Sequence, residues 1–527
     1  MTSENSGQEK PNIIYIYADD LGRGMLSCYG QKHFKTPNID RLAAEGVRFT
    51  NSYGCAVCAP ARASLLTGYH DCHAGTWSYT KAGIYKELSK EDGRSYDEIR
   101  ELINNTSFNE RRDEVFLATI AKRAGLVTGE IGKLEWGFAT TPERIRSHDW
   151  DYHYGYYDHA RCHGFYPPFL FENGEKVDIS GNTDIHCGTT YIEETSENRK
   201  RVEERTDCNV YSQDLFNEKI EAFIRQNSET PFFLYHPSQL PHGPTAVPEV
   251  HPLVKNVDGI TEWEKEYASM ILRLDDTVGL IYSTLEELSI LDNTMIIFSA
   301  DNGHENQYYS QKGRNSGSKR ALDGRQIDHI DLNYTSELVG DVFNGNDGMS
   351  GKKKFSLEGG VRIPYIVRMP NAQNAGVVSD HLIANYDTMA TMAEILEQDV
   401  PDWKDGQSFL TTLKGQKQDP PDYVIFAGNV GPALVSSDGW KVRYLTPVRR
   451  LQLFYLPDDY REENNLAEKE PEKLREMATK LLKCCDGNMY HGTWENHKSI
   501  RVDELLEGKG PEDAFPPFER WTRPVKA

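Results

Sequence analysis

Short apolar runs alternate with amphipathic stretches along most of this chain. Four runs are almost wholly apolar, as is typical of strands buried on both faces of a sheet: residues 13–18, 126–131, 232–235 and 295–300. Helical periodicity fills the intervals between them and predicts helices over residues 39–45, 114–123, 215–225 and 262–288. Strands that alternate with helices in this way predict an α/β sandwich around a large, mostly parallel sheet.

The pattern changes after residue 415. Four short strands are predicted there, with a helix behind them: residues 423–428, 433–437, 441–444, 451–456 and 471–482. Asp438-Gly439 between two of these runs is a hairpin signal. We therefore expect a large α/β domain over residues 1–415 and a smaller subdomain, an antiparallel sheet with one helix, over residues 416–527. The polar segments 78–112 and 303–348 are expected to be loops or insertions over the sheet.

Composition narrows the range of partners. The formal net charge of −22 argues against nucleic acid as a partner, because its phosphates need a basic protein surface.

No apolar run is long enough to cross a membrane. The chain starts with a polar stretch that has no signal-peptide core, so either it stays in the cytoplasm or a signal was removed from a periplasmic or secreted protein. Nine cysteines, an odd number, do not imply a complete disulfide framework.

Polar side chains follow each of the four apolar runs. In an open α/β sheet, ligands bind outside the carboxyl ends of the strands, so these side chains are expected to meet at one edge. They are Asp19-Asp20, Lys133, His242 and Asp301-Asn302.

The carboxylates and the amide among them offer only oxygen ligands. Hard oxygen donors suit Ca²⁺, and less well Mg²⁺, better than zinc. Asp19, Asp20, Asp301 and Asn302 are therefore candidate calcium ligands. The alternative for each motif alone is a plain turn, because Asp-Asp-Leu-Gly and Asp-Asn-Gly both favour turns.

Cys58-Ala59-Pro60-Ala61-Arg62 is the most specific motif. Pro60 stands where a first helical turn should begin, and Ala63 onward continues the helix. Cys58 is then expected at a helix N-terminus, which favours anions, with Arg62 one turn further along the same face.

With this motif in view, the chain resembles the type I sulfatases of the alkaline phosphatase superfamily. The similarity covers about residues 11–470, and the motifs occur in the family's order. They are Asn12-Ile13-Ile14 with Asp19-Asp20-Leu21-Gly22, Thr36-Pro37-Asn38-Ile39-Asp40, Cys58-x-Pro60-x-Arg62, Pro241-His242-x-Pro244, Asp301-Asn302-Gly303, Lys353 before Glu358-Gly359-Gly360, and Glu463-Asn464-Asn465-Leu466.

The resemblance implies a mechanism. A separate formylglycine-generating enzyme would convert Cys58 to formylglycine, whose hydrated gem-diol attacks sulfur. Asp19, Asp20, Asp301, Asn302 and residue 58 would bind Ca²⁺ beside it. By the same resemblance, Arg62 would stabilise the nucleophile, Lys133, His242 and Lys353 would hold the sulfate, and His242 or Lys353 would protonate the leaving alcohol.

One position departs from the family pattern. Where the family often has Gly-Lys-x-His, this chain has Gly132-Lys133-Leu134-Glu135, so Glu135 is a candidate substrate contact or points away from the sulfate. A subset of bacterial sulfatases carries a histidine in a His-x-Tyr-Tyr-Pro-like stretch instead. His163, before Tyr166-Pro167, is the candidate replacement, and the alternative is a histidine that only packs under the loop.

Aromatic and polar residues gather in three stretches: residues 148–166, Trp77 with Tyr79, and His491 with Trp494. Such mixtures suit a sugar ring, although each aromatic alone is better explained by a core position. Asp71 and His73 follow the Cys58 helix and are expected to line the mouth of the site at Cys58.

Cys55-x-x-Cys58 also matches a redox or zinc motif, but no second pair has the right spacing, so Cys55 is expected to be a packing residue.

Three functions compete at this point. The first is a sulfatase acting on a sulfated mono- or oligosaccharide. The second is a phosphodiesterase or phosphonate monoester hydrolase, which shares the fold and the nucleophile. The third is a catalytically silent glycan-binding homologue, which the complete set of expected metal ligands disfavours.

Overall fold

The structure, a computed structural model, describes residues 10–73, 94–105, 113–137, 140–159, 161–183, 208–305, 321–325, 330 and 333–493. A ten-stranded sheet runs through the larger part. Its strands, in spatial order, are β11 (Val377–Ser379), β2 (Val47–Phe49), β10 (Tyr365–Arg368), β9 (Thr294–Ala300), β1 (Asn12–Ala18), β8 (Phe232–Pro237), β4 (Val127–Lys133), β5 (Tyr152–Tyr156), β6 (Phe169–Glu172) and β7 (Glu175–Asp178). A small parallel pair, β3 (Ser52–Tyr53) with β12 (Ile383–Ala384), lies apart from it.

The centre of the large sheet is parallel. Strands β9, β1, β8, β4 and β5 run the same way, while β10 and the β6–β7 hairpin are antiparallel to their neighbours. The four predicted apolar runs are β1, β4, β8 and β9, so these predictions are confirmed. They are nearly all apolar because both faces of each strand are covered.

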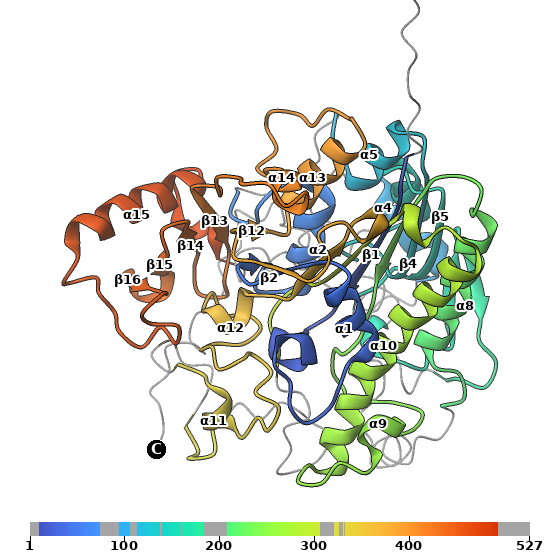
Figure 1. The fold of residues 1–527 in the computed structure, drawn as a ribbon, viewed down its shortest axis with the longest axis horizontal. Coiled ribbons are helices and arrows are strands. Elements are labelled where there is room, and N and C mark those ends of the chain that lie inside the picture. Colours follow the sequence, from blue (N-terminus) through green and yellow to red (C-terminus); the bar gives the residue numbers. More distant parts are fainter. Residues whose placement is uncertain are drawn as a thin grey trace, which may run out of the picture.

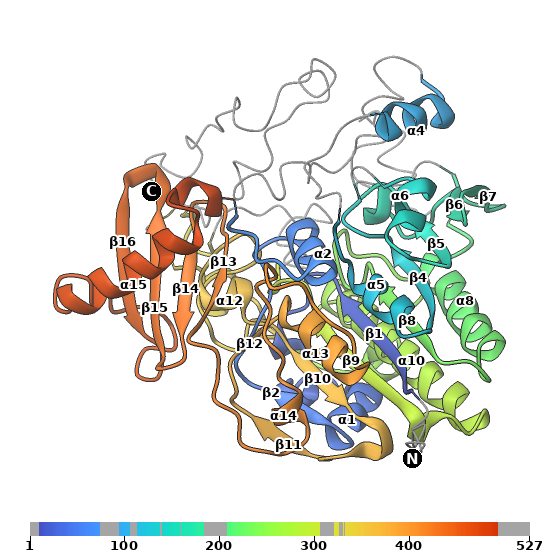
Figure 2. The ribbon, with the colours of Figure 1, turned by 90° about the horizontal axis from the view of Figure 1, so that it is seen from above.

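Helices cover both faces (Figures 1 and 2). Along β1, Ile13, Tyr15 and Tyr17 pack on one face with α2 (Cys58–Thr67), α5 (Leu117–Arg123) and α13 (Asp387–Ile395). The alternate residues, Ile14 and Ile16, pack on the other face with α1 (Pro37–Ala44), α8 (Ser212–Gln226) and α10 (Glu262–Glu287). The expected α/β sandwich is therefore confirmed, and the four predicted helices are α1, α5, α8 and α10.

The remaining short helices lie in the connections. They are α6 (Pro142–Ser147), α9 (Pro252–Lys255), α11 (Ser336–Val339), α12 (Glu358–Val361) and α14 (Leu410–Leu413). Within the segment 78–112, where loops or insertions were expected, residues 96–104 form a helix, α4 (Tyr96–Asn104). Ser95 and Glu98 form a capping box at its start, and Ile99 and Ile103 bury one face, which together stabilise a helix in a polar segment.

The C-terminal part is a four-stranded antiparallel sheet with one helix, as predicted. It contains β13 (Tyr423–Phe426), β14 (Ala433–Ser436), β15 (Trp440–Leu445), β16 (Arg450–Tyr455) and α15 (Pro471–Cys484). Gly439, in the predicted hairpin, has φ +88°, a conformation that favours glycine. The boundary at residue 415 stays a prediction.

A buried ion-pair group joins this sheet to the large domain. The Nζ of Lys441, on β15, lies 2.8 Å from Glu358, on α12, and 2.9 Å from Glu462. Opposite charges buried together satisfy one another and fix the two parts in register. Among the helices described, none has the length and apolar content needed to span a membrane.

Candidate active site

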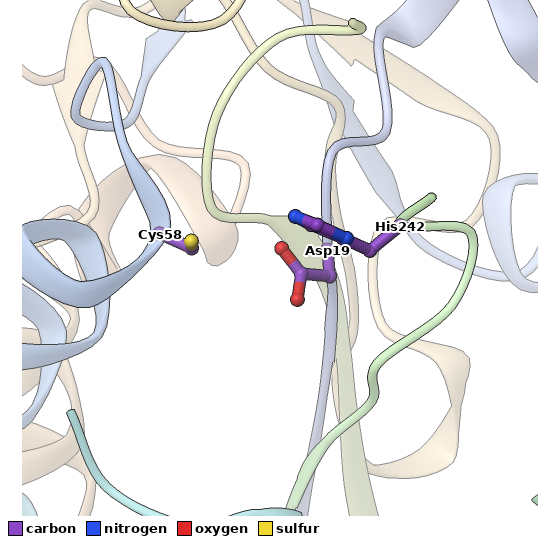
Figure 3. A group of neighbouring side chains, drawn as sticks. All are labelled: Asp19, Cys58 and His242. Atoms are coloured by element: carbon purple, nitrogen blue, oxygen red, sulfur yellow. The ribbon is translucent and has the colours of Figure 1, made fainter. Parts of the chain in front are cut away.

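The ends of neighbouring central strands bring the predicted polar residues together. Asp19 follows β1, Asp301 follows β9, Lys133 ends β4, and His242 lies five residues beyond Pro237, the end of β8. The order β9-β1-β8-β4 makes these strands adjacent, so their carboxyl ends share one edge. Figure 3 shows the side chains of Asp19, His242 and Cys58 as neighbours, although they come from three separate segments of the chain.

The candidate metal ligands form a buried group at this edge. Asp19, Asp20, Asp301 and Asn302 are all fully buried, and ligand oxygens of the three aspartates lie within 4.8 Å of one another. Asp20 has φ +59°, which turns the chain so that its N–H donates to Asp301 Oδ1 at 3.0 Å. The amide of Asn302 donates to Asp20 Oδ1 at 2.8 Å.

Two oxygens of this group have no hydrogen-bond partner among the residues described. They are Asp19 Oδ1 and Asn302 Oδ1, and both are buried. A buried acceptor without a partner is costly, and a cation in the group would satisfy both. With only carboxylate and amide oxygens present, the residues fit a hard divalent ion such as Ca²⁺.

Cys58 is the first residue of α2, as the position of Pro60 predicted. Its Sγ lies within 4.8 Å of ligand atoms of Asp19 and His242, and 3.7 Å from the Nζ of Lys353. Burial raises the pKa of the Cys58 thiol, although the charges of Lys133 and Lys353 oppose this shift. The unmodified thiol is therefore held protonated, which makes it a poor nucleophile.

Three buried cations face the carboxylates. Arg62 Nη2 lies 3.3 Å from Asp301 and 3.5 Å from Asp19. Lys133 Nζ lies 2.6 Å from Asp19. Lys353 Nζ lies 2.7 Å from Asp20 Oδ1. All three predicted cations therefore reach the group.

Sequence reasoning missed one contact in this group. The carbonyl of Ser238 accepts a hydrogen bond from Arg62 Nη2 at 3.2 Å and helps to orient the guanidinium. Ser238 directly follows β8, so the rule about strand ends contained the signal. A serine that acts through its main chain has no side-chain signature.

The charges around Asp19 and Asp301 drive their proton affinities apart. Burial alone would raise the pKa of Asp19, but the surrounding charges, led by Lys133, hold it well below its usual range. Burial and the neighbouring charge of Asp19 raise the pKa of Asp301 well above its usual range. Burial and the like charge of Asp19 thus both favour the neutral form of Asp301.

His242 is a neutral imidazole with a defined tautomer. Its Nδ1 lies 2.6 Å from the carbonyl of Gly243, and its Nε2 lies 3.0 Å from the Nζ of Lys353. Nδ1 therefore carries the proton, and Nε2 accepts from the ammonium. Burial, followed by the charge of Lys353, lowers the pKa of His242.

His163 lies beside His242. The two rings stack with centroids 3.9 Å apart and planes 7° apart. The Nε2 of His163 is buried without a hydrogen-bond partner among the residues described. Burial, and next the charge of His242, lowers its pKa well below the usual value. The candidate replacement imidazole is thus next to the site, and its role stays a prediction.

Glu135 points into a different set of contacts. Its carboxylate lies 2.8 Å from Nδ1 of His148 and accepts from Nε1 of Trp150 at 3.1 Å. Its N–H donates to Glu130 at 2.5 Å, and its φ is +50°. These contacts hold the turn directly after Lys133 and favour the interpretation that Glu135 points away from the sulfate.

Asp71 and His491 lie at the junction with the C-terminal sheet. Asp71 Oδ1 accepts from the N–H of Ala427 at 2.7 Å, and the side chain is 1% exposed. Nδ1 of His491 lies 2.8 Å from the carbonyl of Cys485. The structure gives both residues protein partners, and contact with substrate remains a prediction for each. Trp77, Tyr79 and Trp494 lie outside the described residues.

His73 belongs to a second polar group. Its Nε2 lies 2.9 Å from Asp405, its Nδ1 lies 3.2 Å from Asp486, and its ring stacks on His70 at 4.0 Å. Ligand atoms of His70, His73 and Asp405 lie within 4.8 Å of one another. The Nδ1 of His70 accepts the N–H of Cys72 at 3.3 Å, which places the ring proton of a neutral His70 on Nε2.

Comparisons with known proteins identify the family. The sulfatase family model matches residues 11–398, and a model of the C-terminal region of N-sulphoglucosamine sulphohydrolase matches residues 347–485. The N-acetylgalactosamine-6-O-sulfatase of Bacteroides thetaiotaomicron is 30% identical over 91% of this chain and 94% of its own length. Human N-acetylgalactosamine-6-sulfatase is 27% identical over 78% of this chain and 68% of its own.

Solved structures agree with this assignment. A sulfatase that takes part in glycosaminoglycan metabolism in Bacteroides thetaiotaomicron has a TM-score of 0.66 at 26% identity, covering 90% of this chain and 99% of that one. The phosphonate monoester hydrolase of Agrobacterium radiobacter has a TM-score of 0.54 at 19% identity, covering 92% and 96%, which shows a shared fold. The extent of the family match, the full-length relative and the residues gathered around Cys58 lead to one conclusion: the chain belongs to the sulfatase family and is a sulfatase.

Proposed function

We propose that this sulfatase removes sulfate from a sulfated carbohydrate, with Cys58 oxidised to formylglycine and Ca²⁺ bound by Asp19, Asp20, Asp301 and Asn302. The observation that carries the proposal is the meeting of the α2 N-terminus with this carboxylate group, where Cys58 Sγ lies within 4.8 Å of an Asp19 oxygen. Relatives named for sulfated sugars favour a carbohydrate substrate, among them the N-acetylgalactosamine-6-O-sulfatase that matches nearly the whole chain.

The charges explain how an acidic protein binds an anion. Three buried cationic side chains, Arg62, Lys133 and Lys353, face the three carboxyl groups of the metal site. The positive charge of a bound divalent ion therefore remains available to the sulfate, and the ion polarises a sulfate oxygen when bound. Desolvation of the whole group strengthens this attraction.

The chain's own residues divide the remaining work. The N–H groups at the start of α2 and Arg62 favour negative charge on the hydrated aldehyde of residue 58. Lys133 and Lys353 hold the sulfate oxygens. The Lys353 ammonium already donates to Nε2 of His242 at 3.0 Å, so a proton can pass to the leaving alcohol from either residue of the pair.

A buried cysteine suits this site once it has been oxidised to formylglycine. As a thiol it is protonated and weak, whereas the aldehyde hydrates and supplies a hydroxyl nucleophile. After attack on sulfur, the second hydroxyl allows the adduct to collapse back to the aldehyde and release sulfate. Peptide mass spectrometry of protein co-expressed with a formylglycine-generating enzyme tests for the aldehyde at residue 58.

Activity assays test the reaction itself. A panel of sulfated monosaccharides and disaccharides of defined position, starting with N-acetylgalactosamine 6-sulfate, should contain a substrate that the wild type cleaves and Cys58→Ala does not. Aryl phosphate diesters serve as the comparison. Faster turnover of the diester than of every sulfate ester would assign the site to phosphodiester hydrolysis instead.

A further inference from the structure

The loop between β13 and β14 carries a buried amide without a partner. Asn429 is 1% exposed, and neither Oδ1 nor Nδ2 has a hydrogen-bond partner among the residues described. Native proteins satisfy nearly all buried polar groups, and each exception needs an explanation. The hydrogen-bonding functions of this carboxamide are therefore left for water or a ligand to satisfy.

This loop lies against the segments that carry the reacting groups. The N–H of Asn429 donates to the carbonyl of Lys354 at 2.9 Å, directly after Lys353. The N–H of Lys354 in turn donates to the carbonyl of Ala56 at 2.6 Å, two residues before Cys58. Asn429 is thus two main-chain hydrogen bonds from the turn that presents the nucleophile, although it belongs to the C-terminal sheet.

The loop is also held rigidly. Asp71, which follows the nucleophile helix, accepts the N–H of Ala427 at 2.7 Å. Gly431 has φ +146°, and a Cβ there would come within 1.8 Å of the carbonyl of Tyr444, so the close approach requires glycine. An amide on a loop fixed from both domains is pre-organised, which reduces the entropy lost on binding.

We propose that Asn429 belongs to the subsite for the sugar that carries the sulfate, and that its carboxamide hydrogen-bonds a hydroxyl of that sugar. An amide offers an acceptor and two donors, and a hydroxyl both donates and accepts, whereas sulfate only accepts. The charged groups around Cys58 recognise the sulfate, and this neutral group recognises the ring beside it. The proposal rests on the proposed function, because it requires a carbohydrate leaving group.

The test compares two leaving groups. Asn429→Leu keeps the side-chain volume and removes both hydrogen-bonding functions. For the best sulfated sugar, kcat/KM should fall at least about tenfold, because a site built to bind a hydroxyl loses that contact. For 4-methylumbelliferyl sulfate, which lacks sugar hydroxyls, it should change less than about threefold, because transition-state contacts to the sulfate are unchanged.

A deoxy-sugar series identifies the contact. The wild type should lose activity on one monodeoxy analogue, whereas Asn429→Leu should not distinguish that analogue from the parent sugar, since the interaction is already gone. Thermal unfolding of Asn429→Leu and of the milder Asn429→Asp excludes misfolding. Asn464→Leu, at an exposed asparagine, is the matched control and should leave both substrates unaffected.

Two outcomes overturn the proposal. Equal losses on the sugar and aryl substrates would make Asn429 a structural residue, and no loss on either would leave an ordered water as its partner. A wild type that cleaves the aryl sulfate but none of the sulfated sugars would contradict the proposed carbohydrate substrate itself. This outcome is distinguishable from the other two, because the wild type is assayed before any variant is compared.

Discussion

Burial decides which protonation state each side chain around Cys58 adopts. His242 and His163 stay neutral because desolvation lowers their pKa values, and Cys58 stays a thiol because burial raises its pKa. Lys353 keeps its charge although it is buried, because Asp20 lies 2.7 Å away. The site therefore presents a buried cation, Lys353, beside two neutral imidazoles.

Replacing Lys353 separates its role from that of its neighbour. Lys353→Met should lower kcat about 100-fold, because a buried cation aimed at developing negative charge is lost. Lys352→Met is the matched control, since Lys352 pairs with Glu305 instead, and it should cost less than about threefold. Steady-state kinetics on one sulfate ester measure both, and equal effects would contradict the assignment of Lys353.

Replacing Glu135 tests whether it contacts substrate. Glu135→Ala leaves His148 and Trp150 without their buried acceptor, so the free energy of unfolding should fall by about 3 kcal/mol. We expect an unchanged KM, because the carboxylate is already engaged by His148 and Trp150. Urea unfolding and kinetics measure the two effects, with exposed Glu175→Ala as control. A raised KM at normal stability would instead make Glu135 a substrate contact.

At the scale of elements, the nucleophile helix is tied to the C-terminal sheet just beyond its own end. Asp71 follows α2 and caps the N–H of Ala427 after β13. Burial raises the pKa of Asp71 to about 6, although this hydrogen bond opposes the shift. The hydrogen bond fixes the position of the chain after β13. At neutral pH, however, its acceptor is a buried negative charge on Asp71, which is unfavourable.

This tie should be visible in the pH dependence of stability. In the unfolded chain an aspartate has a pKa of about 3.9. Between that value and the folded value near 6, only the folded state holds the proton, so the free energy of unfolding should fall as pH rises through this window. Asp71→Asn keeps the acceptor and removes the titration.

Urea unfolding at about pH 4 and pH 7 measures the difference. Wild type should lose up to about 2–3 kcal/mol more stability over this range than Asp71→Asn, a value that follows from the raised pKa. Exposed Asp399→Asn should behave like the wild type. Parallel curves for wild type and Asp71→Asn would show that Asp71 is ionised in the folded protein throughout.

At the scale of the whole molecule, the candidate metal site joins distant parts of the chain. Asp19 and Asp20 follow β1, whereas Asp301 and Asn302 follow β9, and Lys133 and Lys353 come from two further segments. A cation bound there cross-links the centre of the sheet. Its binding energy therefore adds to the stability of the folded state.

Calcium should stabilise the protein and support its activity. At a concentration 100 times Kd, Ca²⁺ should raise the free energy of unfolding by about 2.7 kcal/mol and increase Tm. EGTA should abolish turnover, with Ca²⁺ restoring it better than Mg²⁺, because Ca²⁺ accepts carboxylate and amide oxygens in a flexible geometry whereas Mg²⁺ demands a near-octahedral one. Asp301→Ala should remove the calcium-dependent rise in Tm. A rise that persists in this variant would place the ion elsewhere.

The sequence by itself determined the strands and the chemical type of the site. Runs buried on both faces must be nearly all apolar, so β1, β4, β8 and β9 were visible, and each pointed to the residues after it. Cys58 at a helix start followed from Pro60. These features are local, because they depend on spacing and on side-chain chemistry within a few residues.

Tertiary structure alone decided which partners those side chains found. Glu135 turns to His148 and Trp150, His163 stacks on His242, and the main chain of Asn429 bonds Lys354 from another sheet. Such contacts join residues far apart in sequence, and they depend on loop paths and packing that no local pattern encodes. The sequence predicted the candidate reacting groups, and the packing of the large sheet against the C-terminal sheet determined what surrounds them.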